Sequence, residues 1–151
     1  MTSRACRTAI GVFLAFASAA ALAQATPTGL WKTIDDDTKK EKSLVRVVES
    51  GGVYSGRVDK LLDPATPADA VCKACTDERK DKPIAGMAIL RNVRQSADDP
   101  TVFDGGEILD PNNGKVYKVR LKPVDNGSRL EVRGYIGMPL LGRTQTWQRV
   151  E

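Results

Sequence analysis

The chain has 151 residues, a length suited to one domain, and carries 23 lysines and arginines against 19 aspartates and glutamates, a net charge of +4. It contains no histidine. This excludes Ser-His-Asp and Cys-His catalytic units, HExxH zinc sites and histidine-ligated haem. Hydrophobic residues make up 41% of the chain and charged residues 28%, a balance typical of a globular protein rather than a disordered or membrane-embedded one.

Residues 1–23 have the pattern of a secretory signal peptide. Two arginines form a basic start, residues 8–22 are apolar or small, and Ala21-Leu22-Ala23 provides a small-x-small cleavage pattern. A membrane anchor is the alternative, but the apolar stretch is shorter than the roughly 20 residues that span a bilayer. We therefore expect cleavage before Gln24 and a mature, periplasmic chain of residues 24–151 that is not membrane-spanning.

Cleavage would also remove two of the basic residues. The remaining ones are interspersed with acidic residues, as in the run Asp-Glu-Arg-Lys-Asp-Lys at residues 77–82, which is typical of a solvated surface. No basic stripe carries interleaved aromatic residues, so we expect no nucleic-acid partner.

After residue 24, short β-type runs alternate with turn signals. Residues 117–122 place Tyr, Val and Leu on one face and Lys, Arg and Lys on the other, as a strand with one buried face would. Asn113-Gly114 and Asn126-Gly127 are strong hairpin signals. The expected strands cover residues 29–34, 43–49, 53–62, 87–93, 102–109, 115–122, 129–136 and 143–150.

Eight short strands joined mostly by tight turns predict an all-β fold, a single antiparallel up-and-down barrel, because closure removes exposed sheet edges. A two-layer sandwich is the alternative, but a Greek key needs long return connections. The long connection at residues 63–83 is predicted to contain one short helix. Thr66 would cap it, Pro67 would begin it, and it would end near Cys75.

Cys72 and Cys75 form a Cys-x-x-Cys motif in this insertion, whereas Cys6 lies in the segment expected to be cleaved. In an oxidising compartment the pair is expected to form a structural disulfide, which contributes about 2 kcal/mol because the loop is short. A redox-active pair usually begins a helix in a βαβ unit, a context that this sequence lacks. Zinc would need two further ligands. We therefore expect no metal, no cofactor and no catalytic residue.

Two tryptophans mark the expected closure of the barrel. Trp31 and Trp147 lie on the first and last expected strands, which become neighbours if the barrel closes. Arg149 shares a strand face with Trp147 and is expected to lie over an indole and cap one barrel end.

The connection between the last two strands is unusually apolar for a hairpin, since it contains Met138, Pro139, Leu140 and Leu141. Two interpretations follow. The favoured one is that these side chains fold over the barrel mouth and plug it. The other is that they form the rim of a ligand entrance or a partner-binding patch.

Gly29-Leu30-Trp31, together with Arg149, resembles the Gly-x-Trp and closing arginine of lipocalin-like barrels. The whole expected mature chain resembles the bacterial domain-of-unknown-function family 2147. That resemblance implies an exported, lipocalin-like barrel, and it implies no established activity or catalytic residue. The motifs that carry it, in order, are Cys72-x-x-Cys75, Lys82-Pro83-Ile84-Ala85-Gly86, Asp110-Pro111-x-x-Gly114-Lys115, Arg133-Gly134-Tyr135-Ile136-Gly137 and residues 139–147.

We expect a non-enzymatic periplasmic barrel that binds a small apolar or amphipathic ligand. The alternative is an envelope interaction or maintenance protein with a solid barrel core, whose partner would be another envelope protein. A thiol-disulfide enzyme that uses Cys72 and Cys75 is the least favoured hypothesis. A cavity inside the barrel would distinguish the first hypothesis from the second.

Overall fold

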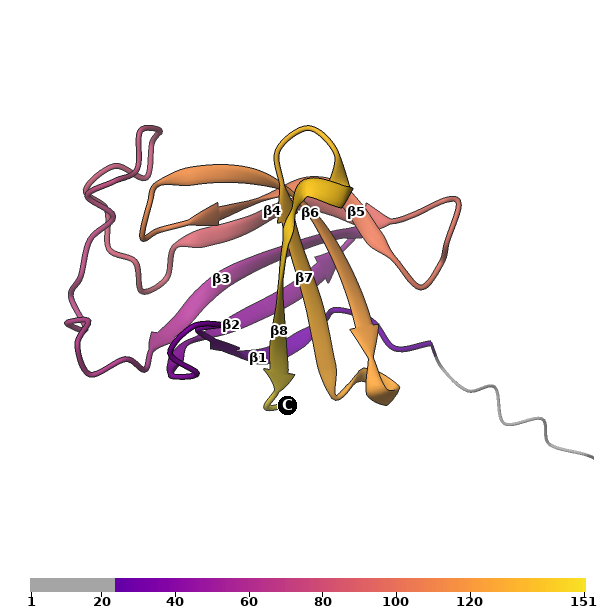
Figure 1. Ribbon diagram of the computed structural model, residues 1–151, viewed down its shortest axis with the longest axis horizontal. Helices are drawn as coiled ribbons and strands as arrows, with labels where there is room; N and C mark the ends of the chain where they lie inside the picture. The colour runs from indigo at the N-terminus through magenta and orange to yellow at the C-terminus, as the bar shows by residue number, and fades with distance from the viewer. Residues whose placement is uncertain (1–23) are drawn as a thin grey trace, which may run out of the picture.

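Eight antiparallel strands, each hydrogen-bonded to the next in the chain, close into a barrel in the computed structural model (Figure 1). The structure describes residues 24–151, so the signal peptide expected at residues 1–23 lies outside the described residues. The strands are β1 (Gly29–Ile34), β2 (Glu41–Ser50), β3 (Val53–Leu61), β4 (Ala88–Gln95), β5 (Phe103–Asp110), β6 (Lys115–Val124), β7 (Arg129–Tyr135) and β8 (Arg143–Arg149). The predicted all-β barrel of about eight strands is confirmed.

The helix predicted from Pro67 to near Cys75 is wrong. The helical turns in the described residues are two 3-10 turns, η1 (Asp125–Gly127) and η2 (Pro139–Leu141). At the expected start of the helix only one turn forms, in which the Ala70 amide donates to the Pro67 carbonyl oxygen. The chain then becomes extended, and residue 71 pairs with Pro83. The Cys72 amide donates to the Lys82 carbonyl oxygen on the other side of the insertion. This amide is therefore not available for the hydrogen bond that would continue a helix.

The two ends of the barrel differ. The start of β1 and the β2–β3, β4–β5 and β6–β7 connections lie at one end of the barrel, here called the closed end. The insertion and the β1–β2, β5–β6 and β7–β8 connections lie at the other, the open end (Figure 1). Near the closed end the interior is solid, and Tyr54 and Phe103 meet edge to face with ring centroids 5.0 Å apart. Fully buried side chains around them include Val45, Val47, Val93, Leu121 and Leu130.

Only a short ladder joins the first strand to the last. Trp31 pairs with Arg149 and Lys32 with Gln148, whereas β1 and β2 pair along the whole of β1. At the closed end the Val150 amide donates to the Leu30 carbonyl oxygen at 2.8 Å. The β1–β8 ladder therefore lies near the closed end and does not extend to the mouth.

Arg149 reinforces this short ladder. Its guanidinium lies over the Trp31 ring, 4.1 Å from the ring centroid, and donates to the carbonyl oxygens of Gly127, Thr28 and Thr26. Trp31 is fully buried, and its indole N–H donates to the Pro27 carbonyl oxygen at 2.7 Å. The stacked pair of Arg149 and Trp31 thus holds the segment before β1 and the residues before β7 by hydrogen bonds.

Gly29 permits this arrangement. A Cβ atom at this position would lie 2.4 Å from Arg149 Nη1, and the backbone φ of +134° is one that side chains disfavour. The Gly-x-Trp motif is therefore explained by the space that the arginine occupies.

We expect Trp31→Ala to lower the free energy of unfolding by about 3–5 kcal/mol, as truncation of a large buried aromatic side chain does. Urea denaturation followed by circular dichroism would measure it. Lys32→Ala, at the next position of the same strand, is the matched control and should change stability by under about 0.5 kcal/mol. A loss below about 1 kcal/mol for Trp31→Ala would contradict the closure described above.

Candidate functional site

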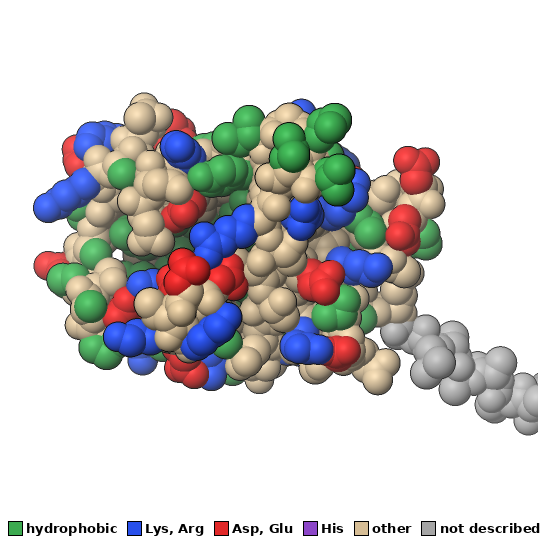
Figure 2. Space-filling model, in the orientation of Figure 1, with side chains coloured by type: hydrophobic (Ala, Val, Ile, Leu, Met, Phe, Trp, Pro, Cys, Tyr) green, Lys and Arg blue, Asp and Glu red, His purple; other side chains and the backbone are tan. Residues whose placement is uncertain are grey.

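A cavity of about 460 Å³ opens at the open end of the barrel. Figure 2 shows a hollow on the left of the molecule with hydrophobic side chains in its depth. Trp147, which is buried, forms part of the cavity lining where the solid half of the barrel begins. Other apolar residues of the lining come from the strands and the insertion, and include Val58, Leu61, Ile84, Ile89, Ile108 and Val132.

A few polar side chains interrupt this apolar lining. The hydroxyls of Thr33 on β1 and Ser43 on β2 share a hydrogen bond of 2.8 Å. Gln145 on β8 accepts a hydrogen bond from the Trp147 indole N–H at 3.4 Å. A wall that combines apolar side chains with fixed polar groups is typical of sites for small ligands.

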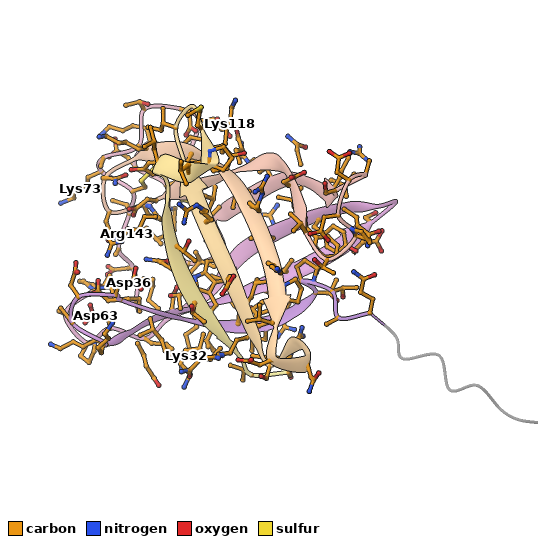
Figure 3. All side chains as sticks on the ribbon, turned by 45° about the vertical axis from the view of Figure 1, so that its right-hand side comes forward. Lys32, Asp36, Asp63, Lys73, Lys118 and Arg143 are labelled. Atoms are coloured by element: carbon orange, nitrogen blue, oxygen red, sulfur yellow. A yellow bond between two sulfur atoms is a disulfide. The ribbon has the colours of Figure 1, made fainter. Side chains whose placement is uncertain are left out.

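Charged residues surround the mouth. Arg143 at the start of β8 reaches Asp36 and Asp37 in the β1–β2 connection, with nitrogen–oxygen distances of 3.2 and 3.5 Å, and Figure 3 shows Arg143 and Asp36 on the open side. The two carboxylates raise the pKa of Arg143. Lys42 pairs with Asp63 and lowers the pKa of that carboxyl. The acidic turn that contains Asp36 and Asp37 is thus bridged to the last strand.

The disulfide between Cys72 and Cys75 is present, with its sulfur atoms 2.04 Å apart. It fixes the insertion against the β5–β6 turn, where the Ala74 carbonyl approaches Gly114 so closely that a Cβ there would lie 1.9 Å from its oxygen. Both cysteines are buried, with exposed fractions of 0% and 1%. Thiol exchange needs an accessible sulfur, so this placement favours a structural role.

A buried arginine also anchors the insertion. Arg79 is 5% exposed, donates to both carboxylate oxygens of Asp77, and donates to the Ala88 carbonyl oxygen at the start of β4 at 3.0 Å. Nearby, Arg91 pairs with Glu78 at 2.7 Å. The hydrogen bonds from Arg79 hold the pKa of Asp77 at about 2. The cavity wall formed by the insertion is therefore anchored by a disulfide on one side and by ion pairs on the other.

The connection expected to plug the mouth does not do so. Met138, Leu140 and Leu141 are 60%, 81% and 78% exposed, so the plug interpretation is wrong. Arg133 donates from the outer face of β7 to the carbonyl oxygens of Pro139 and Leu140, and holds the connection at the side of the mouth. Of the three apolar side chains, Leu141 contributes to the cavity lining.

The structure also separates the four residues expected at the barrel closure. Gly29, Trp31 and Arg149 meet at the closed end, whereas Trp147 lines the cavity. Sequence reasoning missed Thr33, Ser43 and Gln145, which line the cavity with it. The sequence signal that could have identified them is a polar residue at an inward position of an otherwise apolar strand face.

No group of three or more histidine, cysteine, aspartate or glutamate side chains within residues 24–151 is placed to hold a metal ion. Within the same residues, no helix has the length and apolar character needed to cross a membrane.

Comparisons with known proteins agree with this fold. The family model described as "Uncharacterized protein conserved in bacteria (DUF2147)" matches residues 29–149, which confirms the family resemblance. Among solved structures, protein HP1028 from Helicobacter pylori, described as belonging to the lipocalin family, has a similar fold, with a TM-score of 0.70, 22% identity and 84% coverage of both chains. No curated protein matches this chain.

We expect stability to fall as the pH is lowered from about 4 to 2, partly through Asp77. Because the pKa of Asp77 is about 2 in the folded chain and 3.8 ordinarily, its ionised form stabilises the fold above the ordinary value and this contribution disappears on acidification. In Asp77→Asn, which has no titrating group there, urea midpoints should depend less steeply on pH across this range. An equal pH dependence in both proteins would contradict the anchoring role.

Proposed function

The chain belongs to the DUF2147 family of uncharacterised bacterial proteins, and we propose that it is a non-enzymatic barrel that binds a small apolar or amphipathic molecule in the cavity at its open end. The single observation that carries this proposal is a hollow of about 460 Å³ in one half of a barrel whose other half is solid. Cavities that hold small ligands have volumes of roughly 300–1,000 Å³.

The lining indicates the kind of ligand. The wall includes branched aliphatic side chains such as Val58, Ile89 and Ile108, which favour an apolar body. Thr33, Ser43 and Gln145 are the polar groups that would orient it, and charged side chains at the mouth would contact any polar group that remains outside. An amphipathic molecule with its apolar part inside and its polar part at the mouth fits this distribution.

The alternative of an envelope interaction or maintenance protein with a solid core is less well supported, because the core is hollow at one end. A thiol-disulfide enzyme is disfavoured because Cys72 and Cys75 are buried.

Binding would be tested with the fluorescent apolar probe N-phenyl-1-naphthylamine. Trp147 lines the cavity, so excitation of tryptophan should produce energy transfer to bound probe. Gly134→Leu should lower probe affinity by about tenfold or more, since the new side chain would fill part of the cavity. A Cβ at position 134 would lie no closer than 3.5 Å to any neighbouring side chain, so the strand can accept it.

Glu131→Leu is the matched control, because it adds the same side chain at an exposed position of the same strand. It should bind the probe as the unaltered protein does. No saturable binding by the unaltered protein, or equal binding by Gly134→Leu, would refute the proposal.

We also propose that the protein acts in the periplasm after export. Residues 1–23 carry the signal pattern, and an oxidised cysteine pair suits an oxidising compartment.

Intact-mass spectrometry of protein released from the periplasm should give a chain that begins at Gln24 and has no free thiol. Reduction of the disulfide should cost at most about 2 kcal/mol of stability, because the closed loop is short. Retention in the cytoplasm, or an unprocessed start at Met1, would contradict export. Efficient reduction of insulin by the protein would instead support the thiol-disulfide hypothesis.

A further inference from the structure

The β7–β8 connection, residues 136–142, projects from the barrel with apolar side chains outermost, and we call it the lip. Ile136 is 68% exposed and Leu140 81%, with Met138 and Leu141 also mostly exposed. Figure 2 shows hydrophobic side chains gathered over this loop at the top of the molecule. Exposed apolar side chains clustered in this way usually mark an interaction site.

Three carbonyl oxygens at the tip of the lip already have hydrogen-bond partners within the protein. The carbonyl oxygen of Met138 accepts from the Leu141 amide at 3.1 Å, and that of Pro139 accepts from the Gly142 amide at 3.1 Å. Arg133 donates to the carbonyl oxygens of Pro139 and Leu140, and Pro139 has no amide hydrogen to satisfy. Transfer of the loop tip from water to a less polar medium would therefore leave few carbonyl groups without a partner.

Basic side chains lie at the base of the lip. Arg133 contacts it directly, and Lys118 pairs in register with Tyr135, where β7 leads into it; Figure 3 shows Lys118 beside this loop. Glu107 is the register partner of Lys118 on β5. Within residues 24–151, no carboxylate oxygen lies within 4.0 Å of a side-chain nitrogen of Lys118 or Arg133, so neither forms a salt bridge.

The lip is continuous with the cavity. Ile136 and Leu141 belong both to the exposed apolar group and to the cavity lining, and Tyr135 lines the mouth beside them. A molecule that lay against the lip would therefore reach the cavity along an apolar surface.

We propose that the lip docks on the surface of an anionic phospholipid bilayer, with its apolar tips in the interfacial layer and Lys118 and Arg133 at the headgroups. The cavity mouth, which lies beside the lip, would then open next to the bilayer surface, and an apolar ligand would pass between them along the apolar side chains of the lip. A projecting loop with cations behind its tip suits a soft, anionic interface better than a flat protein face. This inference rests on the proposed ligand-binding function.

The test is flotation with vesicles of phosphatidylcholine alone and of phosphatidylcholine with phosphatidylglycerol. Protein expressed from the full sequence is used, with its first residue determined by intact mass, since an uncleaved apolar segment would itself bind lipid. The protein should float with the anionic vesicles, and less so at high salt. Leu140→Ser with Leu141→Ser should weaken binding by about tenfold or more, because two apolar side chains lose their burial.

Two further variants separate the contribution of the basic side chains to vesicle binding from that of the apolar side chains. Lys118→Gln should weaken binding to anionic vesicles by about fivefold and leave binding to phosphatidylcholine unchanged, as loss of one basic residue at an anionic surface does. Val48→Ser with Val150→Ser is the matched control, because both side chains are 50% exposed and lie near the closed end. It should bind vesicles as the unaltered protein does.

The proposal is overturned if the unaltered protein floats with neither vesicle, or if the double leucine variant floats equally well. It is also overturned if the protein is a dimer that the leucine variant converts to a monomer, since a second copy then covers the lip. Probe binding in solution is measured in parallel. Leu140→Ser alone, at a residue outside the cavity lining, should weaken flotation and retain probe binding, whereas Gly134→Leu should lose probe binding and still float, so a failure of docking is distinguishable from a failure of ligand binding.

Discussion

The fold depends on the stacking of Arg149 on Trp31, because this pair reinforces the short ladder that closes the barrel. A partly buried guanidinium is costly unless its donors are satisfied, and desolvation lowers the pKa of Arg149. Three carbonyl oxygens accept its hydrogen bonds, and the face of Trp31 provides a further attraction for the cation. The backbone just before β1 and just before β7 is held in place by the same side chain.

The barrel has a solid half and a hollow half because the size and polarity of its inward side chains differ between the closed end and the open end. Towards the closed end the inward positions carry large side chains such as Trp31, Phe103 and Leu130, all buried. Towards the open end they carry smaller or polar ones such as Thr33, Ser43 and Gly134, which line the cavity. The solid half gives the sheet its rigidity, and the hollow half retains space at the mouth without loss of closure.

Much of the barrel was predictable from the sequence because strands with one buried face alternate visibly, as in residues 117–122, and Asn-Gly pairs mark hairpins. Gly29, Trp31 and Arg149 were recognisable because they resemble the Gly-x-Trp and closing arginine of lipocalin-like barrels, whereas Trp147, also expected at the closure, lines the cavity. The helix expected in the insertion could not be excluded from the sequence, because the capping pattern at Thr66 is a local signal. In the structure the pairing of residue 71 with Pro83 overrides that signal. The cavity was not predictable because the hollow depends on how the inward side chains of all eight strands meet.

The short β1–β8 ladder has a consequence for the mouth. Backbone pairing of the two strands ends at Lys32 and Gln148, so near the opening β1 and β8 are bridged by Arg143 with Asp36 and Asp37. Exposed ion pairs of this kind are weak and are screened by salt. Side chains therefore span the gap between β1 and β8 at the mouth, and under the proposed function a ligand would enter by displacing these ion pairs while the hydrogen bonds of the barrel wall stay intact.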